Sequence, residues 1–230
     1  MDEDDVQIRY RFRLPRHGGG EVDITLHFDP EHFEMRLPAT AAPPSWTDLS
    51  FNQCPNCPLQ ASEVPTCPAA ARLATIVPEF EQVVSFDELH LRVETPERRI
   101  VAETSVQQAL SSLIGLVMAT SGCPRTRFFR LMARYHLPLA TEEETTLRVL
   151  GTYALQSLSR GGESTDLAPL VDLYRELRLV NQAMTRRLGA AGRTDSALNA
   201  VVILDIFALA VPAAIEEAFE PFRALLDPAQ

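Results

Sequence analysis

The chain changes its hydrophobic period once along its length, and this change limits the folds that it can adopt. Apolar residues alternate with polar ones over residues 6–14, again over 22–28, and a third time over 33–37. Alternation with a period of two is typical of strands that bury one face. These three segments therefore predict an antiparallel meander at the N-terminal end of the chain.

A second pair of alternating segments, at 89–93 and 100–102, predicts a hairpin. From residue 105 onward the apolar residues recur with the period of a helix, and a further helix is predicted over 124–136. The other helices are predicted from their capping residues. These are Ser105 before 106–120, Thr141 with Glu144 before a helix to 159, Asp166 before a helix to 188, and Asp195 before a helix to 211. Pro212 is expected to start or kink one more helix.

The order of these elements predicts an α+β fold. A small antiparallel N-terminal sheet (residues 1–104) is followed by a C-terminal helical bundle (105–230), and we expect the two to pack as one unit. Between the strands lies an irregular segment, 46–68, which contains three of the four cysteines. An irregular segment of this length usually has a function or needs a cross-link to hold it in place.

Composition excludes several chemistries. The 21 basic residues are all arginine, so no P-loop, Schiff-base or kinase mechanism that needs a lysine is available in its usual form. The net charge of −10 argues against a nucleic-acid partner. The Gly-x-Ser-x-Gly, Gly-x-Gly-x-x-Gly and His-Glu-x-x-His motifs do not occur. Because no motif for handling a substrate is found, the sequence argues against an enzyme.

The sequence also predicts a cytoplasmic protein without a membrane partner. The chain opens Met-Asp-Glu-Asp-Asp, which lacks the basic and apolar regions of a signal peptide. Its longest apolar stretch, 198–211, is interrupted by Asn199 and Asp205, and we interpret it as a buried helix or a dimer surface. In the cytoplasm thiols stay reduced, so the four cysteines are expected to be ligands or reactive groups.

Every cysteine is followed by a proline, although only 17 of the 230 residues are proline. A proline at the first helical position leaves the cysteine as the N-cap, where the helix dipole lowers the pKa of a thiol. Proline also stiffens a ligand loop before a metal arrives. The pattern therefore predicts one four-cysteine site that binds a metal or cofactor. Its ligands are Cys54, Cys57, Cys67 and Cys123.

Three kinds of centre fit the four cysteines. An iron–sulfur cluster is favoured, and among such clusters the 4Fe–4S type. Cys-Pro recurs in ferredoxin-type motifs, and such clusters tolerate uneven ligand spacing. Zinc is the second alternative, but only Cys54 and Cys57 form a knuckle, and Pro58 replaces its usual glycine. The third is a thiol–disulfide pair of Cys54 and Cys57, which resembles the Cys-Pro-x-Cys of glutaredoxins.

Four residues near Cys123 are predicted to surround the centre. Ser121 and Gly122 would donate hydrogen bonds to a cluster sulfide, or else simply end a helix. Arg125 and Arg127 would offset the negative charge of a thiolate-bound cluster or bind an acidic partner, or else lie on a solvated helix face.

The runs Phe51-Asn-Gln-Cys-Pro-Asn-Cys-Pro-Leu59 and Ser121-Gly-Cys-Pro124 resemble a bacterial family of unknown function, which implies no activity. From the residues themselves we expect a protein of electron transfer or of redox or iron sensing. Its cluster would connect the 46–68 loop to the bundle through Cys123. A zinc-stapled interaction module is the alternative. A protein partner is expected, and a homodimer is compatible with the sequence. Whether the helical half binds a small molecule stays open.

Overall fold

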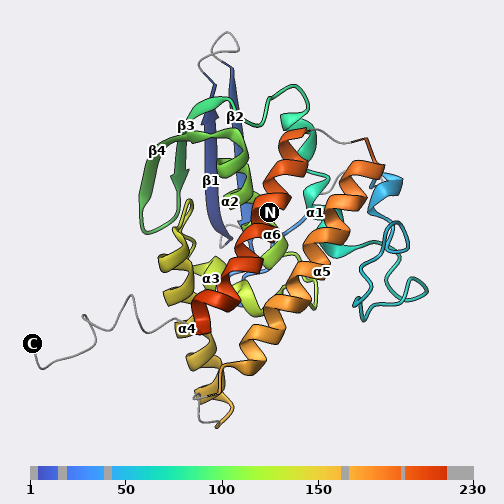
Figure 1. The fold of residues 1–230 in the computed structure, drawn as a ribbon. Helices are drawn as coiled ribbons and strands as arrows, with labels where there is room; N and C mark the ends of the chain where they lie inside the picture. Colours follow the sequence, from blue (N-terminus) through green and yellow to red (C-terminus); the bar gives the residue numbers. More distant parts are fainter. Residues whose placement is uncertain (1–4, 15–19, 39–42, 162–165, 193–194, 217–230) are drawn as a thin grey trace, which may run out of the picture.

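The structure is a computed structural model and describes residues 5–14, 20–38, 43–161, 166–192 and 195–216. It confirms the α+β arrangement, with a four-stranded antiparallel sheet followed by a mostly helical region (Figure 1). The strands lie in the order β2-β1-β3-β4. Their bounds are β1 Val6–Arg13, β2 Glu21–Phe28, β3 Glu88–Glu94 and β4 Arg99–Ser105.

The alternation over 6–14 produces the two faces that it predicts. Ile8, Tyr10 and Phe12 of β1 are buried, whereas Arg9 and Arg13 between and beside them are exposed. Because successive strand residues point to opposite sides of the sheet, a single alternating run gives β1 a core face and a basic solvent face.

The prediction of a third meander strand over 33–37 is wrong. Only Met35 forms a bridge, to Phe28, and the second neighbour of β1 is β3. The chain turns sharply after β2 because the Asp29 carboxylate accepts the backbone N–H of His32 at 2.6 Å. Phe33 then adopts a positive φ of 53° and stacks on Phe28, with ring centroids 4.4 Å apart. The turn thus removes this segment from the sheet.

The helical half differs from the prediction at one helix and at one helix end. In place of a helix over 124–136, the chain forms a 3-10 turn at Arg127–Phe129 and a short α3. The last helix runs to Glu216 with Pro212 inside it, so no separate helix starts at Pro212. The bounds of the helices are α1 Pro68–Leu73, α2 Val106–Ala119, α3 Arg130–Arg134, α4 Glu142–Ser159, α5 Ala168–Ala190 and α6 Asp195–Glu216.

The helices form layers on one face of the sheet (Figure 1). α2 contacts β3 and β4 on one side and α6 on the other, and α5 packs along α6. The main hydrophobic cluster includes the inner face of the sheet, α2, and parts of α1, α5 and α6. A smaller cluster joins α4, α5 and α6 at the end away from the sheet, through Val149, Leu170, Tyr174 and Val211.

Helix α6 is long and apolar enough to cross a membrane by length and composition alone. Its window Asp195–Ala213 has a mean hydropathy of 2.0, and 33% of that window is buried inside the protein. The helix packs against α2 and α5, as a core helix does, while Val202, Ile206 and Leu209 stay exposed on one face. This packing is compatible with a soluble protein.

Candidate functional site

The structure brings the four cysteines into one neighbourhood beside α1. Cys67 is buried as the N-cap of α1, and the other three are half-buried. Burial, and after it the nearby thiols of Cys67, Cys123 and Cys57, raises the pKa of the Cys54 thiol to about 12. Burial also raises the pKa of the Cys123 thiol. Cys54 and Cys123 are therefore neutral thiols at physiological pH.

The prediction of a four-cysteine metal centre is wrong. Among the residues that the structure describes, no group of three or more His, Cys, Asp or Glu side chains is placed to hold a metal ion. This finding removes both the iron–sulfur protein and the zinc-stapled module. The described cysteines are all free, and none lies at disulfide distance from another. The prediction of a Cys54–Cys57 thiol–disulfide pair is therefore wrong as well.

The physical reason is burial of the thiols in apolar surroundings. Cys67 belongs to the main hydrophobic cluster, and Cys54, Cys57 and Cys123 pack against it. The Cys67 side chain forms no capping hydrogen bond, and Cys123 precedes a turn in place of a helix. A cysteine at a helix N-terminus is expected to have a lowered thiol pKa. At Cys54 and Cys123 the loss of solvation has the opposite and larger effect, so that their pKa values are raised. The cysteines therefore pack as small apolar side chains.

Ser121 and Gly122 end helix α2. The Ser121 hydroxyl donates to the Met118 carbonyl at 2.8 Å and accepts the backbone N–H of Cys123 at 3.2 Å. Gly122 has a φ of +82°, which favours glycine because a Cβ is strained there. The predicted role of these residues around a cluster is therefore wrong, and the alternative of a helix stop describes them.

Arg125 and Arg127, the two arginines predicted near the centre, have different surroundings in the structure. Arg125 donates from Nε to the Asn56 carbonyl at 2.6 Å and pairs with Glu176 of α5 at 3.5 Å. Arg127 is exposed, and it lines a surface cleft on the far side of the 3-10 turn. Neither residue has a cluster to neutralise.

The irregular 46–68 segment is attached to the bundle by Arg187 of α5. This buried guanidinium donates from Nη1 to the carbonyls of Trp46 and Asp48, at 2.7 and 2.6 Å, and from Nη2 to that of Leu49 at 3.2 Å. It also lies over the Phe51 ring, 5.8 Å from its centroid. The loop is thus held to the bundle by hydrogen bonds in place of the expected cluster: those from Arg187, and those from Asn56 Nδ2 to the carbonyl and carboxylate of Glu176 in α5.

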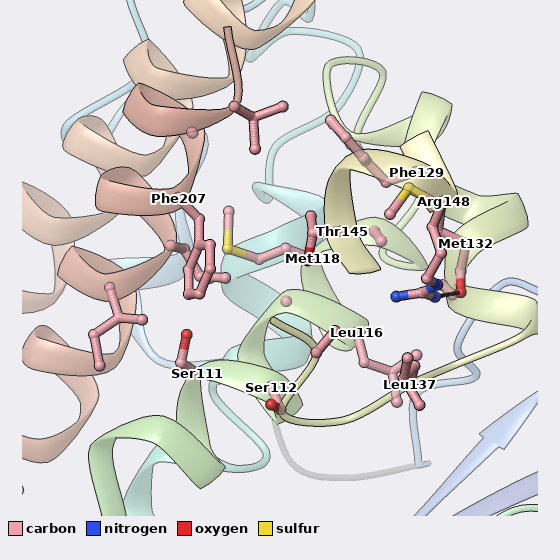
Figure 2. A pocket seen from close by; sticks show the side chains of 18 of the residues that line it. Ser111, Ser112, Leu116, Met118, Phe129, Met132, Leu137, Thr145, Arg148 and Phe207 are labelled. Atoms are coloured by element: carbon pink, nitrogen blue, oxygen red, sulfur yellow. Dashed lines mark hydrogen bonds between the residues drawn. The ribbon is translucent and has the colours of Figure 1, made fainter. Parts of the chain in front are cut away.

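A cavity of about 520 Å³ lies inside the helical half, between α2, α4, α5, α6 and the segment that contains α3. Most of its wall is apolar. Figure 2 shows Phe207 of α6 and Arg148 of α4 on opposite sides of the cavity, with Ser111 and Ser112 of α2 along its lower edge. Gly115 lets α2 and α6 approach closely here, because an added Cβ would lie 3.3 Å from Leu204.

Arg148 is the one charged group among the described side chains that line the cavity. Its Nη2 donates to the carbonyls of Met132 and Tyr135, at 2.7 and 3.1 Å, which fixes the guanidinium. Burial lowers the pKa of Arg148, although arginine stays protonated at any physiological pH. No described carboxylate forms an ion pair with it. Glu144, which acts on it electrostatically, accepts the Thr141 backbone N–H at 2.8 Å in the capping box.

Two further polar side chains line the cavity. Asn181 is buried, and its Nδ2 has no hydrogen-bond partner in the described part of the chain. His136 is buried as well, and its Nε2 is hydrogen bonded to the hydroxyl of Tyr10 in the sheet. Burial, and after it the charge of Arg148, lowers the pKa of His136 to about 3. His136 is therefore neutral, and the charge in this cavity comes from Arg148.

None of these cavity residues was a candidate from the sequence, although one signal points to Asn181. It interrupts an apolar stripe of α5 with helical spacing, where a polar residue needs a partner. The other stripe residues are Leu170, Tyr174, Leu177, Met184 and Leu188. Arg148 gives no such signal, since arginine is ordinary in a helix of mixed composition.

Fold and site together define an α+β protein with an apolar cavity, containing one fixed positive charge, inside its helical half. The chain belongs to the family described as domain of unknown function DUF6901, whose family model matches residues 8–227. Comparisons with curated proteins and with solved structures found no match. The family agrees with the resemblance to a group of unknown function. The description of the family names no activity, and the cavity is the feature of the described residues that indicates one.

Proposed function

We propose that this protein binds an amphipathic small molecule in the cavity of its helical half, with an apolar body and an anionic, oxygen-bearing head such as a carboxylate. The observation that supports this most strongly is Arg148, a fixed cation without an ion-pair partner among the described residues, in a cavity that is otherwise uncharged.

The size and lining of the cavity favour an apolar ligand body. Small-molecule sites in proteins typically enclose about 300–1,000 Å³ and have apolar walls with a few polar groups. The cavity of about 520 Å³ lies within this range, with Met118, Met132 and Phe207 in its wall. Flexible methionine side chains adapt to irregular apolar shapes. We therefore expect the ligand to be an aliphatic or partly aromatic molecule.

The charge of the cavity favours an anionic head. Arg148 is half-buried, and a guanidinium partly removed from water loses solvation that the two carbonyls accepting from it do not replace with an opposite charge. A carboxylate would supply the missing charge and form short charge-assisted hydrogen bonds. The unpartnered Nδ2 of Asn181 favours a ligand oxygen in the same cavity, because a buried donor without an acceptor is destabilising.

The protein is also proposed to act in the cytoplasm. Its free cysteines are compatible with a reducing compartment, where thiols persist.

The experiment is a calorimetric titration of the full chain with decanoate, a ten-carbon carboxylate. Arg148→Gln removes the charge and is expected to weaken binding by about ten- to a hundredfold, the value of a hydrogen bond to a charged group. Ser111→Leu reduces the space in the cavity and is expected to weaken binding as well. Arg175→Gln, at an exposed arginine outside the cavity, is the matched control. Equal affinity in all four proteins would contradict the proposal.

A further inference from the structure

A second concave site lies on the other side of the segment that contains α3. Residues of this segment alternate between two surfaces: Phe129, Met132 and His136 line the cavity described above, whereas Arg127, Arg130 and Arg134 line a separate cleft. The cleft encloses about 1020 Å³. Its other walls are the turn after β2, the C-terminal end of α4, and the first turns of α5.

The cleft is strongly basic in a protein whose net charge is −10. Four arginines line it, three from the α3 segment and Arg160 from the end of α4 on the facing wall. Glu31 is the one carboxylate among the described lining residues, and its side chain is 84% exposed. Positive charge on two facing walls focuses the local field on the space between them.

Two of these arginines are held in place by neighbouring acids. Arg130 donates from Nη2 to Glu34 at 2.6 Å, and Arg134 donates from Nη1 to Glu97 at 3.1 Å. The Arg130 side chain is only 14% exposed, and its buried Nε has no hydrogen-bond partner among the described residues. Arg130 Nη1 also donates to the His32 carbonyl at 3.3 Å, so the guanidinium is held at both terminal nitrogens while its Nε stays without a partner among the described residues.

The other two arginines are available to a ligand. Arg127 and Arg160 are exposed, and within the described residues neither forms an ion pair or a side-chain hydrogen bond. They belong to different elements on different walls. A compact anion between the walls can therefore be contacted from two directions, whereas one helix face offers a single direction.

We infer that this cleft binds a small molecule that bears phosphate groups, held between Arg127 and Arg160 and contacted by Arg130. The planar fork of arginine matches the oxygens of phosphate and forms paired, charge-assisted hydrogen bonds with them. The cleft is bounded by four chain segments and has about the size of a small-molecule site, which fits a compact polyanion better than an extended acidic peptide. Phe128 and Tyr153 in its wall provide apolar surface for an organic part of the ligand.

The test uses inorganic pyrophosphate as the probe, titrated calorimetrically into the full chain at constant ionic strength. The double variant Arg127→Gln/Arg160→Gln is expected to lose at least about tenfold in affinity, because it removes two charged donors. The control Arg175→Gln/Arg186→Gln has the same change of net charge at two exposed arginines of α5 that do not line the cleft. Thermal unfolding of both variants verifies that they fold.

Three results would overturn the inference. The first is the absence of pyrophosphate binding to the wild-type protein. The second is an equal loss of affinity in the cleft variant and in the control, since this would mean that net charge alone attracts the anion. The third is tighter binding of an oligo-glutamate peptide than of pyrophosphate, which would assign the cleft to an acidic protein segment.

Discussion

His136 should make this protein less stable as the pH falls below the ordinary histidine pKa of 6.5. Its ring is buried between the sheet and the cavity, and its Nε2 is hydrogen bonded to the Tyr10 hydroxyl. Burial, and after it the charge of Arg148, lowers its pKa from 6.5 to about 3. The neutral ring can accept a hydrogen bond from the Tyr10 hydroxyl, whereas a protonated ring would lose this acceptor and place a second cation near Arg148.

The size of the effect follows from proton linkage. An unfolded chain binds a proton at His136 as the pH falls through about 6.5, whereas the folded chain binds it only near 3. Between these values the unfolded state holds more protons, so the free energy of unfolding decreases as the pH falls. Each pH unit removes about 1.4 kcal/mol, so a fall to pH 4.5 removes about 2.7 kcal/mol.

The assay is urea unfolding of the wild-type protein and of His136→Gln between pH 7.5 and 4.5. Glutamine keeps an acceptor for the Tyr10 hydroxyl but does not titrate. Carboxylates such as Glu94 and Glu97, whose pKa values are lowered by hydrogen bonds from arginine, titrate equally in both proteins and cancel in the difference. The difference in free energy of unfolding should change by about 2.7 kcal/mol over the window. Parallel curves for the two proteins would refute the reasoning.

Three further predictions concern the loop, the thiols and the end of α2. Arg187→Gln should destabilise the protein by about 3 kcal/mol and speed amide hydrogen exchange over 46–51, because three carbonyls lose a buried charged donor, whereas Arg186→Gln should do neither. In the folded protein at pH 8, iodoacetamide should leave Cys54 and Cys123 unmodified by mass spectrometry, since their raised pKa values leave little thiolate. Gly122→Ala should lower the free energy of unfolding by about 1 kcal/mol in urea titrations, because of its positive φ.

The parts of the fold that could be predicted from the sequence are those governed by short-range signals. Thr141 and Glu144 form the capping box of α4 as predicted, and the Ser105 side chain accepts the backbone N–H of Gln108 at the start of α2. The alternation of apolar and polar residues predicted the four strands of the sheet, because this pattern depends only on residues that are neighbours in the sequence. By contrast, which strand pairs with β1 depends on the distant hairpin of β3 and β4, and a turn at Asp29 removes the segment that follows β2.

The site was not predictable for a related reason. The Cys-Pro dipeptides are a local pattern, but the raised pKa of Cys54 comes from its burial and, after that, from Cys67 and Cys123 farther along the chain. Arg148 likewise stands out because, among the described residues, no carboxylate lines the cavity beside it. Five chain segments form this cavity, so the surroundings of Arg148 cannot be read from its neighbours in the sequence. Of the cavity residues, Asn181 alone gives a signal in the sequence, as a polar residue in an apolar stripe.

The central claim is that the charge of Arg148 selects an anionic head in the cavity. The most direct measurement is the ratio of the dissociation constants of 1-decanol and decanoate, determined for the wild-type protein and for Arg148→Gln. These two ligands share their chain and differ in their head group. We expect a ratio of about ten to a hundred in favour of decanoate for the wild type, and a ratio close to one for the variant. A ratio that is the same in both proteins would contradict it.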